Sequence, residues 1–286
     1  MNDIRLIALD LDGTLLDSEK RISPRNRAAL DAAAERGVHI VPTTGRFFDA
    51  MPAVVRDLPF VRYAVTSNGA AIYDRAEKRN ISECRIPLET AFAILDALDD
   101  FDCIYDCYMD DWGWNSEATV AKADEYAPDI HYAAMIRDLR THVPDLKEHL
   151  RATGHDVQKL LAYVKDPSLY GPITAAVAAV APGTVATASN SRMFEFNAPG
   201  AHKGAALAKL AEHLGFGIEN VMGFGDGLND LTMVRDAGLG VAMANAVPEV
   251  LAAAKYIAPS NDDDGVAEAI EHFETLLFTQ PPGSRP

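Results

Sequence analysis

The amino-acid sequence predicts an α/β protein in which a doubly wound parallel sheet is interrupted by an inserted α+β domain. The chain has 286 residues, enough for about two domains, and 48% of them are apolar, which can supply a sizeable core. Short apolar runs alternate with helical patterns at both ends of the chain, as they do in parallel sheets. Residues 84–190, between these ends, follow a less regular pattern and contain both tryptophans.

The first elements alternate between strand and helix. Residues 4–9 are a short, mostly apolar run that stops at an Asp/Gly cluster, as a strand buried on both faces does. Residues 24–36 carry apolar side chains at helical spacing, with Ser23 placed to cap the start of the helix and Gly37 its end. A strand, a helix and a strand are expected next, at 38–41, 47–57 and 63–66.

The same alternation returns near the C-terminus. Helices are predicted at 203–214, 228–236, 248–254 and 265–277, and strands at 221–224 and 240–242. We therefore expect residues 1–83 and 191–286 to build one sheet, and residues 84–190 to form the inserted domain. The final segment, 279–286, is rich in proline and is predicted to be disordered.

The charge and cysteine content exclude several classes of protein. Twenty-six basic residues against 42 acidic ones give a net charge of −16, which repels phosphate backbones and anionic lipid headgroups. Nucleic acid and membranes are therefore not expected as partners. Three cysteines make no disulfide framework, and none has zinc-site spacing with histidine. With no signal peptide or membrane span recognisable, we expect a cytoplasmic protein.

Acidic side chains follow two of the predicted strands. Asp10 and Asp12 come after the first strand, at the edge where open α/β sheets bind ligands. Two carboxylates ~4 Å apart at an effective dielectric of ~20 repel by roughly 4 kcal/mol, so the pair needs a cation or a proton. A second pair, Asp226 and Asp230, follows a later strand. Hard oxygen ligands without Cys or His favour Mg²⁺.

Carboxylates with Mg²⁺ are suited to phosphoryl chemistry, because an aspartate can act as the nucleophile and form an aspartyl-phosphate. The phosphoryl anion also needs donors. Thr44, Gly45 and Arg46 follow the second strand and offer a hydroxyl, an open backbone N–H and a cation. Lys203 offers an ammonium near the start of a helix.

Together these segments resemble the four motifs of the haloacid dehalogenase (HAD) superfamily, and within it the Cof-type IIB hydrolases. The motifs are Asp10-x-Asp12-Gly13-Thr14, Thr44-Gly45-Arg46, Lys203-Gly204 and Gly225-Asp226-x-x-Asn229-Asp230. Three further segments, at 67–70, 240–246 and 264–266, are also similar to the family. The resemblance covers nearly the whole chain, and the order and spacing of the motifs carry it. It implies a HAD-like Rossmannoid core with an inserted cap.

The resemblance implies specific roles for these residues. Asp10 would be the nucleophile, and Asp12 the general acid and base. Mg²⁺ would bind Asp10, the backbone carbonyl of Asp12 and Asp226, with Asp230 nearby or acting through water. The phosphate oxygens would meet the Leu11 N–H, Thr44, Gly45, Lys203 and Asn229. The cap, 84–190, would select the leaving group of a small phosphorylated metabolite, such as a sugar phosphate or a phosphorylated cofactor.

Several alternatives stay open at this point. A HAD-type phosphomutase would pass the phosphoryl group to a sugar hydroxyl instead of water, and a regulatory protein could keep the fold without turnover. Arg46 could contact substrate or form a structural ion pair. The run 96–111 holds seven aspartates and no basic residue, so it could disfavour anionic leaving groups or simply be a solvated face. His202 is expected at the surface or behind the site. The sequence identifies neither the substrate nor the oligomeric state.

Overall fold

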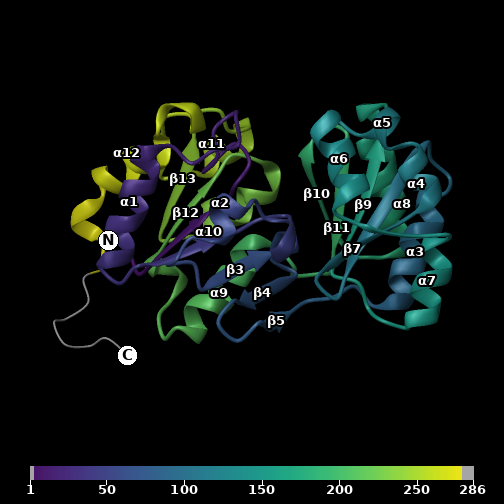
Figure 1. Cartoon of the computed structure of the whole chain (residues 1–286), viewed down its shortest axis with the longest axis horizontal. Coiled ribbons are helices and arrows are strands. Elements are labelled where there is room, and N and C mark those ends of the chain that lie inside the picture. The colour runs from purple at the N-terminus through teal and green to yellow at the C-terminus, as the bar shows by residue number, and fades with distance from the viewer. Residues whose placement is uncertain (1–2, 279–286) are drawn as a thin grey trace. The chain divides into compact units, whose positions relative to one another are not determined.

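The computed structural model describes residues 3–278, whose contacts divide them into two compact units (Figure 1). The first unit runs to Gly45, resumes for Met51–Ser82 and takes up the chain again at His202. The second unit consists of Arg46–Ala50 and Glu83–Ala201. The predicted disordered segment 279–286 lies outside the described residues. Within the described part of the chain, no helix is both long and apolar enough to cross a membrane.

The first unit is built on a parallel sheet of five strands in the order β14-β13-β12-β1-β2. The strands are β1 (Leu6–Leu9), β2 (His39–Pro42), β12 (Val221–Gly225), β13 (Leu239–Met243) and β14 (Tyr256–Ala258). β1 lies between β2 and β12, so Leu6 pairs with His39 on one side and with Val221 on the other. This arrangement confirms the predicted doubly wound parallel sheet, and it makes the first strand a central one.

The third predicted strand pairs differently from the expectation. β3 (Tyr63–Thr66) forms an antiparallel sheet with β4 (Ala71–Asp74) and β5 (Arg79–Glu83), in the order β3-β4-β5. It reaches the parallel sheet through a single parallel bridge, between Thr43 and Val65. The short turn after β3 explains the difference, because a connection this tight can reverse a strand but cannot make a parallel crossover.

The helix predicted over 265–277 ends at His272, before a 3₁₀ turn at Glu274–Leu276, and the other helices of the first unit follow the predicted positions with one exception. The helices are α1 (Pro24–Glu35), α2 (Ala53–Arg56), α9 (Lys203–His213), α10 (Leu231–Asp236), α11 (Pro248–Ala253) and α12 (Gly265–His272). Ser23 caps α1 as predicted, because its side chain accepts a hydrogen bond from the N–H of Asn26. The predicted helix over 47–57 is wrong. A 3₁₀ turn at Phe48–Ala50 and the short α2 replace it, since Pro52 disfavours a helical conformation at Met51.

One core cluster of the first unit lies between the sheet and helix α9. Leu6 and Ala8 of β1 pack with Leu207 and Leu210 of α9 in one buried cluster. Ile7, which points to the other face of the sheet, is also fully buried. Burial of both faces explains why β1 reads as a continuous apolar run.

The second unit is a six-stranded sheet in the order β10-β11-β9-β6-β7-β8, with helices packed on it. Its strands are β6 (Cys103–Met109), β7 (Trp112–Ser116), β8 (Thr141–Val143), β9 (Lys159–Val164), β10 (Val185–Asn190) and β11 (Met193–Asn197). Its helices are α3 (Leu88–Leu98), α4 (Glu117–Ala121), α5 (Ala123–Tyr126), α6 (Ile130–Asp138), α7 (Leu146–Thr153) and α8 (Tyr170–Val180).

The boundary between the units differs from the predicted one at residue 191. Residues 193–197 were expected to belong to the unit of the first sheet, but they form β11, which pairs antiparallel with β9 and places Phe194 opposite Ala162. It also forms a hairpin with β10, so a division at residue 191 would cut through the hairpin. The structural boundary lies eleven residues later, between Ala201 and His202.

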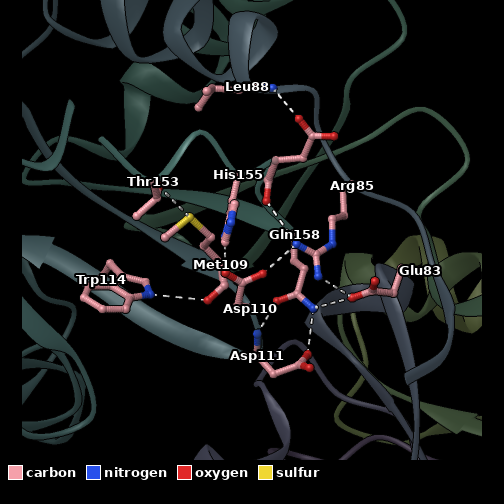
Figure 2. Close-up of polar contacts among 11 residues, drawn as sticks. Glu83, Arg85, Leu88, Met109, Asp110, Asp111, Trp114, Thr153, His155 and Gln158 are labelled. Carbon is pink, nitrogen blue, oxygen red and sulfur yellow. Dashed lines mark hydrogen bonds and ion pairs between the residues drawn. The ribbon is translucent and has the colours of Figure 1, made fainter. Parts of the chain in front are cut away.

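A network of polar contacts holds the start of the second unit to its sheet (Figure 2). Arg85 donates hydrogen bonds to Glu83 and to Asp110, each over 2.8 Å. Gln158 and Asp111 exchange two hydrogen bonds, of 2.6 Å and 2.9 Å. Asp110 and Asp111 belong to the tight turn between β6 and β7, where both have left-handed backbone conformations, with φ of 53° and 58°.

The aspartate-rich run 96–111 is largely paired with cations from elsewhere in the second unit. The ion pairs join Lys147 to Asp96 and Asp99, Lys165 to Asp102, Arg140 to Asp106 and Arg85 to Asp110. The Arg140–Asp106 pair is fully buried. This pairing favours a structural role for the run over a uniformly anionic surface.

Candidate active site

The predicted site residues lie at the carboxyl ends of neighbouring parallel strands. Asp10 directly follows β1, Asp226 directly follows β12, and Thr44 comes two residues after β2. The N–H of Asp10 donates to the carbonyl of Phe224 over 3.1 Å, which ties the first loop to β12. Because these three strands are adjacent, their ends meet at the edge where such sheets bind ligands.

Three carboxylates converge at this edge. Asp10, Asp226 and Asp230 each offer an oxygen, and these oxygens lie within 4.8 Å of one another. Asp10 and Asp230 are buried. The side chain of Asp12 takes a different direction: it is partly exposed and accepts a 2.7 Å hydrogen bond from Lys20. The structure thus brings together the side chains of three of the four acidic residues predicted to bind the metal. The fourth residue, Asp12, was expected to bind through its backbone carbonyl.

Lys203 is the counter-charge of this cluster. Its ammonium is fully buried and donates to Oδ1 of Asp10 and to Oδ1 of Asp230, each over 2.6 Å. Lys203 is the first residue of α9, and His202 caps that helix by accepting a hydrogen bond from the N–H of Ala205. His202 therefore acts behind the site, through the position of the helix.

Asp230 organises the loop that carries Asp226. Its Oδ2 accepts the N–H groups of Asp226 and Gly227 over 3.0 Å and 2.9 Å, while its Oδ1 accepts the Lys203 ammonium. Both oxygens of Asp230 are thus engaged with the protein. This pattern favours a positioning role over direct contact with a metal ion.

The loop after β1 packs directly on Asp226. The hydroxyl of Thr14 donates to Oδ1 of Asp226 over 2.8 Å. Gly13 has a φ of +87°, and a Cβ there would lie 2.4 Å from Oδ2 of Asp226. Only glycine allows this approach without displacing the carboxylate.

The electrostatics of the cluster favour a bound cation. Burial raises the pKa of Asp10 well above its usual range, and the Asp230 carboxylate adds to this shift while Lys203 opposes it. Burial, followed by the charge of Asp230, raises the pKa of Asp226 to about 7. Burial lowers the pKa of Lys203, but the carboxylates of Asp10 and Asp230 have the larger effect, and the lysine pKa is raised. One ammonium thus faces three carboxyl groups, and a proton or a metal ion can neutralise the remaining negative charge.

The predicted phosphate contacts surround the same edge. Asn229 lies in the 3₁₀ turn Leu228–Asp230 and donates to Oδ1 of Asn68 over 3.3 Å. Thr44 is buried, and its N–H donates to the carbonyl of Val65. Leu11 and Gly45 directly follow Asp10 and Thr44 in the chain. Their roles toward phosphate stay predictions.

Arg46 lies among the residues of the second unit. Its guanidinium donates to the carbonyl of Ala50 over 3.3 Å. This contact stabilises the turn Phe48–Ala50. The two alternatives for Arg46, a contact with substrate and a structural ion pair, stay predictions.

Sequence reasoning missed several contributors to the site. Thr14, Asn68 and Asn245 all stand in segments that resemble the family, and that membership was the available signal. Asn245 donates to the carbonyl of Gly13 over 2.8 Å and so supports the loop after β1. Lys20 lies in an exposed loop and carried no signal.

Comparison with known proteins decides the family. A family model described as haloacid dehalogenase-like hydrolase matches residues 7–270. The chain belongs to the haloacid dehalogenase-like hydrolase family. This result confirms the resemblance drawn from the motifs and the prediction of a HAD-family hydrolase of phosphoric monoesters.

Relatives of this HAD hydrolase are similar along nearly their whole length. It is 32% identical over 271 residues to the 5-amino-6-(5-phospho-D-ribitylamino)uracil phosphatase YcsE of Bacillus subtilis, covering 95% of this chain and 96% of the relative. It is 30% identical to the pyridoxal phosphate phosphatase YbhA of Escherichia coli, covering 93% and 97%. The fold matches that of the HAD subclass IIB sugar phosphatase BT4131 with a TM-score of 0.80 and 24% identity, covering 94% and 99% of the two chains.

Proposed function

We propose that this HAD hydrolase is a Mg²⁺-dependent phosphatase that removes phosphate from a small phosphorylated metabolite through an aspartyl-phosphate on Asp10. The observation that carries the proposal is the buried contact of Asp10 with Lys203, beside two further carboxylates. A carboxylate held in this way can attack phosphorus, while the ammonium next to it can bind a phosphoryl oxygen. The relatives named above are a phosphatase of 5-amino-6-(5-phospho-D-ribitylamino)uracil and a phosphatase of pyridoxal phosphate. A sugar phosphate or a phosphorylated cofactor is therefore the substrate class we propose.

The reaction has two steps, and both use Asp10 and Asp12. The Asp10 carboxylate attacks phosphorus, the bond from phosphorus to the leaving oxygen breaks, and Asp12 gives its proton to that oxygen. Asp12 then takes a proton from water, which attacks the aspartyl-phosphate, releases inorganic phosphate and restores the Asp10 carboxylate. The partly exposed position of Asp12 is compatible with this exchange of protons.

The acidic cluster fits Mg²⁺ by its chemistry. It offers hard oxygen ligands and an excess of negative charge, and its buried carboxyl groups have raised pKa values. Asp10, Asp226 and the backbone carbonyl of Asp12 would hold the ion, with Asp230 nearby or acting through water. Bound Mg²⁺ would neutralise charge on the carboxylates and on the phosphoryl group.

The phosphoryl group would be held by donors from four loops. We assign its contacts to the Leu11 N–H, Thr44, Gly45, Lys203 and Asn229. Because Lys203 is fixed by two carboxylates before substrate arrives, little reorganisation is needed when charge develops. The second unit, which contains the predicted cap 84–190, would select the leaving group. We expect the enzyme to act in the cytoplasm.

A screen of phosphorylated metabolites with Mg²⁺, scored by phosphate release, tests the proposal. We expect turnover of at least one metabolite, falling to background in Asp10→Asn, which keeps the size of the side chain but loses its nucleophilic charge. Activity of Asp10→Asn within about tenfold of the parent would remove Asp10 as the nucleophile. An isomerised phosphate ester in place of free phosphate would identify a phosphomutase. A parent chain that turns over no phosphomonoester would contradict the proposal.

A further inference from the structure

The turn after β3 is held in a strained conformation at the same edge of the sheet. Ser67, Asn68 and Gly69 have φ angles of 51°, 59° and 98°. Two consecutive residues other than glycine in the left-handed region are uncommon, although asparagine tolerates that region better than most. Such strain persists only where the surrounding structure imposes it, and it gathers at functional sites.

This turn contacts three of the proposed phosphate-binding residues. The N–H of Asn68 donates to the carbonyl of Thr44 over 3.0 Å. The side chain of Asn229 donates to Oδ1 of Asn68 over 3.3 Å. A Cβ added to Gly69 would lie 3.0 Å from the backbone nitrogen of Lys203, so the turn also packs on the start of α9. Asn68 therefore lies where these three segments meet.

The carboxamide of Asn68 keeps one donor without a partner. Asn68 is only 3% exposed, and among residues 3–278 no group accepts a hydrogen bond from its Nδ2. A buried N–H without an acceptor destabilises a folded protein, so native structures contain few of them. Oδ1 and Nδ2 belong to one planar group, which places this donor in the neighbourhood of Asn229. An anion bound by Asn229 would supply the missing acceptor.

We propose that Asn68 is a further phosphate-binding residue, whose Nδ2 donates to an oxygen of the phosphoryl group while its Oδ1 orients Asn229. The inference rests on the proposed phosphatase function and extends its phosphate site to a fifth segment, the turn Ser67–Gly69. The ligand is the phosphoryl group of a monoester, or inorganic phosphate as the released product. The turn is strained because its backbone must bring the carboxamide to this place.

Inhibition by inorganic phosphate, in the presence of Mg²⁺, measures this contact directly. In Asn68→Gly the backbone can keep its left-handed conformation while the donor is lost. We expect the inhibition constant for phosphate to rise roughly 10- to 100-fold, the effect of losing one hydrogen bond to a charged group. The melting temperature of the free protein should change little, because the substitution removes an unpaired donor together with a hydrogen-bond acceptor. The increase in melting temperature that phosphate produces should shrink.

A pair of variants separates binding from positioning. Asn229→Ala removes the side chain that Oδ1 of Asn68 orients, and Asn68→Gly combined with Asn229→Ala removes both side chains without adding charge. If Asn68 acts only by orienting Asn229, the double variant binds phosphate as tightly as Asn229→Ala does. If Nδ2 contacts the phosphoryl group, the double variant binds phosphate more weakly than Asn229→Ala. If the glycine variant does not fold, Asn68→Ala takes its place in both proteins.

Asn220→Ala is the matched control. Asn220 is also buried and lies just before β12, at the opposite end of that strand from Asp226, where its side chain donates to the carbonyl of Asp3. We expect this variant to lower the melting temperature and to leave phosphate inhibition unchanged.

The measured outcomes distinguish a failure of the Asn68 assignment from a failure of the proposed phosphatase function. If the parent releases phosphate, and either Asn68→Gly binds it within about threefold of the parent or the double variant binds it as tightly as Asn229→Ala, Asn68 is not a phosphate ligand and the proposed function stands. If the parent neither turns over a phosphomonoester nor is stabilised by phosphate with Mg²⁺, the proposed function fails, and the assignment of Asn68 fails with it.

Discussion

The ammonium of Lys203 lies 2.6 Å from Oδ1 of Asp10, although 193 residues separate the two in the chain. A second hydrogen bond of the same length joins this ammonium to Asp230. One buried cation thus connects the loop after β1 with the loop after β12. In the proposed mechanism it holds the transferring phosphoryl group, and in the resting protein it offsets the charge of the carboxylates.

Replacing Lys203 by Met should affect both catalysis and stability. Loss of a preorganised donor at the transition state typically costs ~3–4 kcal/mol, so we expect kcat to fall by ~10²–10³. The melting temperature should depend more steeply on Mg²⁺ than in the parent, because the metal becomes the main counter-charge. Lys209→Met, an exposed position on the same helix, should change neither property. A kcat near that of the parent would make Lys203 an ordinary helix residue.

Replacing Asp226 by Ala should weaken the use of Mg²⁺. One hard oxygen ligand is lost, so the Mg²⁺ concentration that gives half the maximal rate should rise by ~10-fold or more. The measurement is phosphate release as a function of Mg²⁺ concentration. Asp31→Ala, a partly exposed position on α1 whose side chain pairs with Arg27, provides the control. An unchanged metal requirement would show that Asp226 does not contact the ion.

Stability of the metal-free protein should fall as the pH rises from about 4 to about 7. In that window the unfolded chain has released the Asp226 proton, whereas the folded chain still holds it, since burial raises the pKa of Asp226 to about 7 from an ordinary value of 3.8. The folded state therefore binds more protons, and the free energy of unfolding decreases with pH. Thermal melts in a chelator should show this decrease, and Asp226→Asn should make it smaller. Mg²⁺ should stabilise the parent more at pH 8 than at pH 5, and a gain that does not grow with pH would contradict the assignment.

Replacing Gly13 by Ala should disturb the site more than strain alone can explain. Gly13 and Gly215 have similar φ angles, +87° and +84°, but only at Gly13 would a Cβ meet another group, the Asp226 carboxylate. Gly215→Ala should cost about 1 kcal/mol through backbone strain and leave turnover intact. Gly13→Ala should lower the melting temperature further and also raise the Mg²⁺ requirement. Equal effects of the two substitutions on stability and turnover would mean that the loop tolerates displacement of Asp226.

The local elements were largely predictable because their causes lie within a few residues. Ser23 and Pro24 determine the start of α1, and the apolar run 4–9 contains the buried strand β1. The helix expected over 47–57 is interrupted before Pro52, because a proline disfavours the helical conformation of the residue that precedes it. Strand β11 was misplaced for another reason: its partner β9 lies thirty residues earlier, and no local pattern specifies that pairing.

The sequence by itself determined which residues could carry phosphoryl chemistry, since acidic motifs after parallel strands must meet at one edge of the sheet. Tertiary structure decided how they are used. It directed the Asp12 side chain toward Lys20, engaged both oxygens of Asp230 with the protein, and left Nδ2 of Asn68 without a partner among the described residues. It also paired the aspartates of 96–111 with distant cations, including the buried Arg140. Burial and hydrogen bonding depend on segments far apart in the chain, and they become readable only when the sheet has brought those segments together.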